Sequence, residues 1–130
     1  MDATAGFISA FALTLVLLAL VVVTGFRAKR RWHLSFVACT VACLGVTIAF
    51  ALELGKHFDL KAAGAITPIH LTLAKVATAS YLLPAVTGLR TIFVPATRRL
   101  HRKAAFVALA LTVAAAITGT WMMCLAPRIG

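Results

Sequence analysis

Long apolar stretches separated by short polar links dominate the chain. Residues 3–26 and residues 34–52 contain no charged side chain. Residues 68–89 contain Lys75 as their one formal charge, and residues 104–127 form a fourth apolar stretch. A helix needs about 20 apolar residues to cross the roughly 30 Å of hydrocarbon in a bilayer. Each of the four stretches meets this requirement, so the pattern predicts four transmembrane helices.

The predicted fold is an all-α integral membrane protein, a four-transmembrane-helix bundle that forms a single domain over residues 1–130. Strands are excluded because no stretch alternates with period two and because an open sheet leaves its backbone unpaired in lipid. Pro84 is expected to kink the third helix and to free the carbonyl of Ser80. The predicted helices cover about residues 5–26, 33–56, 68–93 and 102–126.

Composition supports a lipid-facing surface. The chain is 62% hydrophobic and 12% charged, whereas a soluble domain averages about 45–50% apolar and about 25% charged residues. Such a chain cannot cover its surface with polar groups, which excludes disorder and a soluble enzyme. The sequence also lacks a nucleophile–base arrangement, a Gly-rich phosphate loop and a Cys-x-x-Cys motif. We therefore expect no enzymatic activity.

The positive charges report topology. The chain has 13 Lys and Arg residues against 3 Asp and Glu. Nine of the 13 lie in two links, residues 27–33 and residues 90–103. The positive-inside rule places both links in the cytoplasm and both termini outside. Basic clusters beside a membrane are explained by anionic lipid, so nucleic acid is not an expected partner.

Four histidines are the main candidates for chemistry. His33 and His101 begin the second and fourth helices on the inner side, whereas His57 closes the second helix and His70 begins the third on the outer side. Two histidines from neighbouring helices can hold a b-type haem inside a bundle. We predict haem or metal ligation first by His70 and His57, then by His101 and His33. A role at the lipid phosphate level is the alternative for the two histidines that follow Arg-Arg pairs.

Small residues follow two of these histidines at helical spacing. From His70 they are Ala74, Ala77, Tyr81, Pro84 and Gly88; from His101 they are Ala105, Ala108, Thr112, Ala115 and Gly119. A flat macrocycle needs such a surface beside its ligand. Small residues also let membrane helices pack closely without any cofactor, and the pattern alone leaves both interpretations open.

Two charges lie within the predicted spans, where ionisable residues are functional candidates. Glu53 lies one turn before His57 on the same face. It is predicted to orient that imidazole or to serve as a hard metal ligand beside it. Lys75 points away from the His70 face, so we expect it to extend towards the membrane surface, to pair with Glu53 or to contact a partner subunit.

Sulfur-containing residues form a second candidate metal site. Met122, Met123 and Cys124 lie near the outer end of the fourth helix, and soft donors of this kind suit Cu(I). The same residue types are also ordinary at a membrane boundary. Cys39 and Cys43 are four residues apart and are expected to be small packing residues.

Four short motifs occur in an order and spacing similar to those of a known family. They are Arg30-Arg31-Trp32-His33, Ile69-His70-Leu71-Thr72-Leu73-Ala74, His101-Arg102-Lys103 and Ile117-Thr118-Gly119. Over about residues 28–123 the chain resembles a small bacterial membrane family that includes cytochrome oxidase assembly proteins of the CtaM (YozB) type. The resemblance implies a multi-pass protein of the bacterial inner (plasma) membrane that takes part in maturation of haem–copper oxidases.

The resemblance also bears on individual residues. It implies that His33, His70 and His101 occupy the family's histidine positions. His57, Lys75 and the Met122–Cys124 cluster depart from the pattern. A complete outer pair of His57 and His70 therefore cannot be carried over from the family.

We therefore expect a small membrane protein that handles haem or copper in a respiratory context. Its expected partners are the lipid bilayer and a larger membrane complex such as a terminal oxidase. The alternative is a non-catalytic accessory subunit of a larger respiratory or photosynthetic complex, which explains the short links without any cofactor. A small transporter component is a third possibility.

Overall fold

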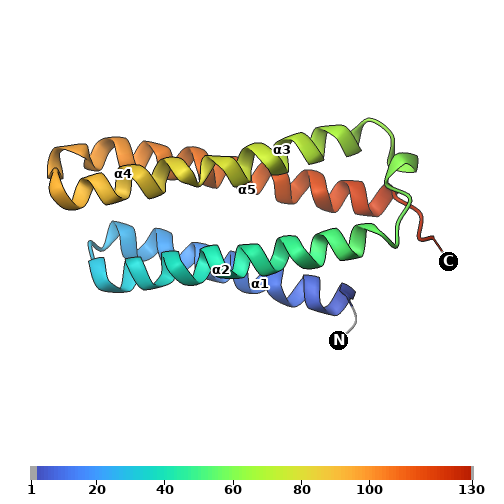
Figure 1. Ribbon diagram of the computed structural model, residues 1–130, viewed down its shortest axis with the longest axis horizontal. Helices are drawn as coiled ribbons and strands as arrows, with labels where there is room; N and C mark the ends of the chain where they lie inside the picture. Colours follow the sequence, from blue (N-terminus) through green and yellow to red (C-terminus); the bar gives the residue numbers. More distant parts are fainter. Residues whose placement is uncertain (1–2, 130) are drawn as a thin grey trace. The chain divides into compact units, whose positions relative to one another are not determined.

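Helices account for all the long elements of the computed structural model, which describes residues 3–129 (Figure 1). Four helical spans are long and apolar enough to cross a membrane: Ala3–Phe26, Arg30–Gly55, Ile66–Phe93 and Pro95–Leu125. This confirms the four predicted spans. The elements in chain order are α1 (Ala3–Phe26), α2 (Arg30–Gly55), η1 (Leu60–Ala63), α3 (Ile66–Ser80), α4 (Leu82–Phe93), η2 (Pro95–Thr97) and α5 (Arg98–Leu125).

The α-helices of all four spans begin two to four residues earlier than predicted, and the difference is largest for α2 and α5. α2 begins at Arg30 rather than at residue 33, and α5 begins at Arg98 rather than at residue 102. Arginine is a good helix former, so the Arg-Arg pairs form the first turns of these helices instead of belonging to the links. α2 also ends at Gly55, which leaves His57 in the turn that follows it.

The third span is broken where Pro84 predicts a kink. α3 ends at Ser80 and α4 begins at Leu82. Proline has no N–H, so the carbonyl four residues before it, that of Ser80, loses its helical partner. The Ser80 hydroxyl donates a hydrogen bond to the Ala77 carbonyl at 2.7 Å. The break leaves Tyr81 at the junction of the two helices.

The chain divides into two compact units. In the first, up to Phe58, α1 and α2 form an antiparallel pair joined by a short link (Figure 1). In the second, Asp59–Ile129, α3 and α4 pack one after the other along α5. Asp59 fixes the segment that enters the second unit through two contacts. Its carboxylate caps η1, and the backbone N–H of Asp59 donates to the Pro127 carbonyl at 2.9 Å.

Polar side chains connect the two helices of the first unit. The hydroxyl oxygens of Thr14 and Thr47 lie 2.9 Å apart and are buried. The Cys43 thiol donates to the Ala10 carbonyl at 3.4 Å. Cys43 is therefore a residue of the helix interface, as expected, whereas Cys39 is exposed. Both are free thiols.

Small residues form the interface of the second unit. Ala77 on α3 and Ala104 and Ala108 on α5 are buried. The Tyr81 hydroxyl lies 2.8 Å from that of Thr112. The two series of small residues that follow His70 and His101 at helical spacing, called here the small-residue stripes, thus face each other. This confirms helix packing as one of their roles. The surface between α3 and α5 is occupied by this packing.

Tyr81→Phe tests the hydrogen bond at this interface. The variant keeps the ring and removes the hydroxyl that bonds to Thr112. We expect the free energy of unfolding to fall by about 0.6–1.7 kcal/mol, the range measured for hydrogen bonds between membrane helices. Reversible unfolding in mixed micelles measures it. Thr78→Val is the control, since its exposed hydroxyl bonds to Ala74 of its own helix; an equal loss in both variants would contradict a special role for Tyr81.

Candidate functional site

The dipeptide Thr-Gly occurs three times in the chain, and each copy lies against a histidine from the helix paired with it. We call each copy a Thr-Gly seat. The first seat belongs to α1, the second to α4 and the third to α5. The three combinations are Thr24-Gly25 with His33, Thr87-Gly88 with His101, and Thr118-Gly119 with His70.

The threonine of each seat faces the same imidazole atom. Nδ1 lies 3.4 Å from the hydroxyl oxygen of Thr24 in His33. The corresponding distance is 3.3 Å from Thr87 to His101 and 3.3 Å from Thr118 to His70. All three histidines are half-buried. The Thr-Gly seats therefore present one repeated geometry at three places in the chain.

The glycine of each seat brings the ring close to the helix backbone. A Cβ atom placed on Gly25 would lie 3.3 Å from Cε1 of the seated ring. The same distance is 3.0 Å for Gly88 and 2.7 Å for Gly119. The last value is shorter than real Cβ contacts. A side chain at Gly119 would therefore collide with the His70 ring.

Two of the histidines also bond to the backbone of the helix that carries the seat. Nδ1 of His33 lies 3.0 Å from the Val21 carbonyl oxygen. The His70 imidazole forms a hydrogen bond with the backbone of Ala115. Val21 and Ala115 each precede the seat threonine by three residues. The same face of the helix thus supplies both contacts.

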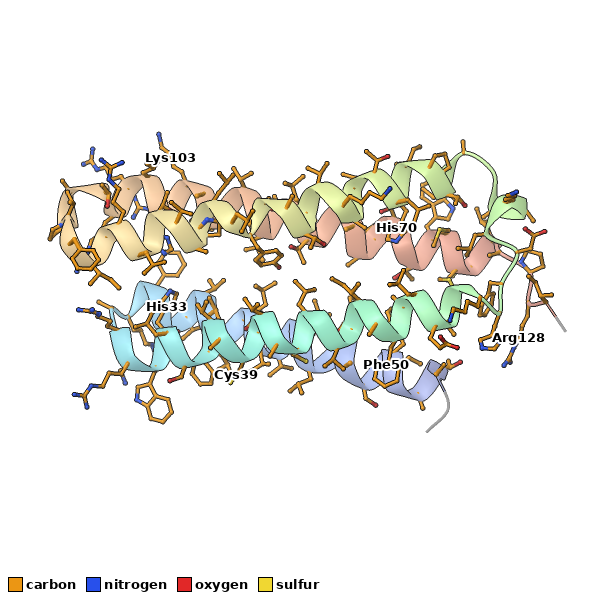
Figure 2. The ribbon with its side chains drawn as sticks, in the orientation of Figure 1. His33, Cys39, Phe50, His70, Lys103 and Arg128 are labelled. Atoms are coloured by element: carbon orange, nitrogen blue, oxygen red, sulfur yellow. The ribbon has the colours of Figure 1, made fainter. Side chains whose placement is uncertain are left out.

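The second unit contains two seats in a reciprocal arrangement. His70 at the start of α3 lies on the seat near the end of α5, and its ring lies between these helices in Figure 2. His101 near the start of α5 lies on the seat of α4. Thr87 follows His70 by 17 residues, and Thr118 follows His101 by 17 residues. Each span therefore carries one histidine and one seat.

The first unit contains one seat and a different contact at its other end. Phe50 follows His33 by 17 residues, where the other two spans have threonine. A Cβ atom on Gly6 would lie 2.5 Å from the Phe50 ring. The first unit therefore has one histidine on a Thr-Gly seat and, at its other end, the Phe50 ring packed on Gly6. The second unit has a histidine on a Thr-Gly seat at both ends.

His57 differs from the other three histidines. It lies in the turn after α2 and is exposed, and the Thr-Gly seat of its own unit is filled by His33. The Glu53 carboxylate, which was predicted to orient His57 or to pair with Lys75, lies 2.6 Å from Lys56 Nζ. The Lys56 and Glu53 side chains are both more than half exposed. Among the residues described, Lys56 is the ion-pair partner of Glu53.

The predicted histidine pairs join different units of the chain. His57 and His33 belong to the first unit, and His70 and His101 to the second. Ligation by the outer pair and by the inner pair therefore stays a prediction. Within residues 3–129, no group of three or more His, Cys, Asp or Glu side chains is placed to hold a metal ion.

The predicted cluster of soft donors does not share one face of α5. Met122 is buried, Met123 is half-buried and Cys124 is an exposed free thiol. Successive residues project about 100° apart on a helix, which separates Met122 from Cys124. A copper role for these residues stays a prediction without support from the packing.

The sequence analysis counted Gly88 and Gly119 among the small residues but did not pair the threonines and glycines of the seats with the histidines. One signal could have found two of them, because the spacing from histidine to Thr-Gly is the same in the third and fourth spans. Lys75, the remaining charge of the predicted set, is exposed on α3.

Comparison with known proteins identifies no relative. No protein-family model, no curated protein and no solved structure matches this chain. The resemblance to oxidase assembly proteins therefore depends on the four short motifs, and the histidines with their seats are the features of the structure that bear on function.

Proposed function

We propose that the chain is a small multi-pass membrane protein that binds a b-type haem or a copper ion through histidine imidazoles in a respiratory context. The observation that supports the proposal is the Nδ1 contact repeated at His33, His70 and His101. Histidines that ligate metals commonly have their other ring nitrogen bonded to a protein oxygen, which fixes the orientation of the ring. The seats supply such an oxygen.

The donor set of the described residues fits an imidazole-bound group. Haem iron and copper both accept imidazole nitrogen. With Nδ1 facing the seat, ligation would use Nε2. His70 is the leading ligand because its ring touches Thr118, Gly119 and Ala115 and is half-buried near the start of its span. When bound, haem or copper would supply electron-transfer chemistry, and the chain would hold and orient it.

The charge distribution supports a defined orientation for this protein. The basic links that follow α1 and α4 lie in the cytoplasm under the positive-inside rule, which leaves both termini outside. The membrane in this proposal is the bacterial inner membrane. The partner is a larger complex such as a terminal oxidase, as the resemblance implies. Handling of the cofactor during assembly of that complex is the role that joins these features.

A second candidate is a non-catalytic accessory subunit of a larger membrane complex. One observation favours it: the small-residue stripes already serve as the interface between α3 and α5. Large apolar side chains also remain on the outside of α4, where a partner or lipid can cover them: Leu83, Val86, Leu89 and Phe93 are each more than half exposed. In this function the seats would hold helices together.

An absorption spectrum with metal analysis separates these two functions. We expect protein purified in mild detergent to show b-type haem bands or bound copper. His70→Ala should abolish them because it removes the leading ligand, whereas Thr72→Ala, at an exposed position on the same helix, should not. A colourless, metal-free preparation that co-purifies with a large complex would exclude cofactor binding and favour the accessory subunit.

His57→Ala tests the outer pair in the same preparation. Loss of the haem bands in both His57→Ala and His70→Ala would support ligation by these two histidines. Bands that persist in His57→Ala would remove His57 from the ligand set, in keeping with its exposed position outside the Thr-Gly seats.

A further inference from the structure

The hydroxyl hydrogen of each seat threonine is directed at its own helix. Thr24 donates to the Leu20 carbonyl at 2.7 Å. Thr87 donates to the Leu83 carbonyl at 2.6 Å, and Thr118 donates to the Ala114 carbonyl at 2.8 Å. A hydroxyl group has one hydrogen and two lone pairs. In each seat the hydrogen is used within the helix, so the oxygen offers lone pairs to the ring.

A lone pair facing Nδ1 determines where the imidazole proton lies. A neutral imidazole has one protonated nitrogen that donates and one bare nitrogen that accepts. Nδ1 must therefore donate to the threonine oxygen. The backbone contact agrees with this assignment, because the Val21 carbonyl oxygen, 3.0 Å from Nδ1 of His33, can only accept.

We propose that the three Thr-Gly seats hold His33, His70 and His101 in the Nδ1-protonated tautomer and so make Nε2 the nitrogen offered to a ligand. Thr24, Thr87 and Thr118 are positioning residues in this proposal. The tautomer follows from the hydrogen bonds alone, whereas the identity of the ligand as haem iron or copper rests on the proposed function.

The glycines are needed for the same geometry. The ring of His70 lies so close to α5 that a Cβ on Gly119 would be 3.2 Å from Nδ1 and 3.3 Å from Nε2. A larger residue would push the whole ring away from the helix and lengthen the bond to Thr118. Threonine and glycine therefore act together: glycine admits the ring and threonine sets its proton.

A fixed tautomer has a direct consequence for ligation. The bond made by one ring nitrogen decides which nitrogen is available to a metal. An imidazole held with Nε2 bare needs no proton shift when it binds. Part of the ordering that binding requires is then already present in the free protein.

Nitrogen NMR of histidine side chains tests the proposal on the full-length protein without added cofactor. The sample is labelled with 15N-histidine and studied in micelles at mildly alkaline pH, where imidazole is neutral. We expect His33, His70 and His101 to show a protonated Nδ1 and a bare Nε2. His57 is the internal reference, because it is exposed and lies outside the Thr-Gly seats. A protonated Nε2 at His70 would overturn the proposal.

Variants of Thr118 assign the effect to the seat. Thr118→Val removes the oxygen, and we expect the tautomer ratio of His70 to shift about fivefold towards protonated Nε2, the size of one net hydrogen bond. Thr118→Ser should restore the wild-type ratio. Thr120→Val is the matched control, since this exposed threonine on α5 bonds to Ala116 of its own helix. An unchanged ratio in Thr118→Val would contradict a positioning role for Thr118.

A titration with ferric haem keeps this inference distinct from the proposed function. An Nδ1-protonated His70 in a protein that takes up no haem would support the role of the seats in setting the tautomer and would count against haem binding. Haem uptake by a protein whose His70 is protonated at Nε2 before haem is added would overturn the role of the seats in setting the tautomer and would support haem binding. The wild-type spectrum alone decides the tautomer if a variant fails to fold.

Discussion

Gly119→Ala is expected to lower the free energy of unfolding by about 1–3 kcal/mol, the usual cost of forcing extra atoms into a packed interface. The added methyl group would lie 2.7 Å from Cε1 of His70. The ring and the backbone of α5 cannot both keep their positions at that distance. Because the ring is the more mobile group, the Nδ1 contact with Thr118 should be lost with the stability.

The other glycines supply a graded series for this measurement. Gly88→Ala and Gly25→Ala place the methyl group at 3.0 Å and 3.3 Å from the seated ring, so their losses should be smaller in that order. Gly45→Ala is the control, since its Cβ meets nothing within 4 Å and alanine is the better helix former. Unfolding in mixed micelles measures the series. Equal stability of Gly119→Ala and wild type would contradict the close packing of His70 on α5.

Ala108→Leu should be similarly damaging for a different reason. Ala108 is 2% exposed in α5, within the small-residue interface of the second unit. Leucine adds three carbon atoms where two helices meet, so the helices must separate or the side chain must take a strained rotamer. We expect a loss of about 1–3 kcal/mol in the free energy of unfolding.

Ala110→Leu is the matched control on the same helix. Ala110 is exposed, and leucine is as acceptable to lipid as alanine. The same substitution two residues away should therefore leave stability nearly unchanged. Circular dichroism during unfolding by detergent compares the two variants. Equal losses in both would show that Ala108 is not an interface position.

The spans could be predicted from the sequence because a bilayer imposes a minimum length of uncharged helix. A kink in the third span could be predicted because Pro84 lacks the N–H that would bond to the Ser80 carbonyl; the structure has a break there, between Ser80 and Leu82. The starts of α2 and α5 were missed because the Arg-Arg pairs were assigned to the links. α2 and α5 nevertheless begin at Arg30 and Arg98, since arginine is a good helix former.

The candidate site could be predicted only in part. Histidine is recognisable by type, but its partners are not, because Thr118 and His70 are 48 residues apart and meet only through the pairing of α3 with α5. Threonine and glycine are also ordinary in membrane helices. The ion pair of Glu53 with Lys56 is local, because the two residues are three apart and pairs at that spacing are common on helices. It was missed because His57 and Lys75 were considered as the partners of Glu53.

The spacing of the two seats of the second unit has a consequence for the membrane itself. His101 and Thr118 are separated by 17 residues of α5, which corresponds to about 26 Å of helix. This length is close to the roughly 30 Å of a hydrocarbon core. Each imidazole can then sit at a boundary between hydrocarbon and headgroups. A thicker bilayer would draw one of them into the hydrocarbon, and a thinner one would tilt the hairpin, so we expect the spacing of the two seats to favour bilayers of about this hydrocarbon thickness.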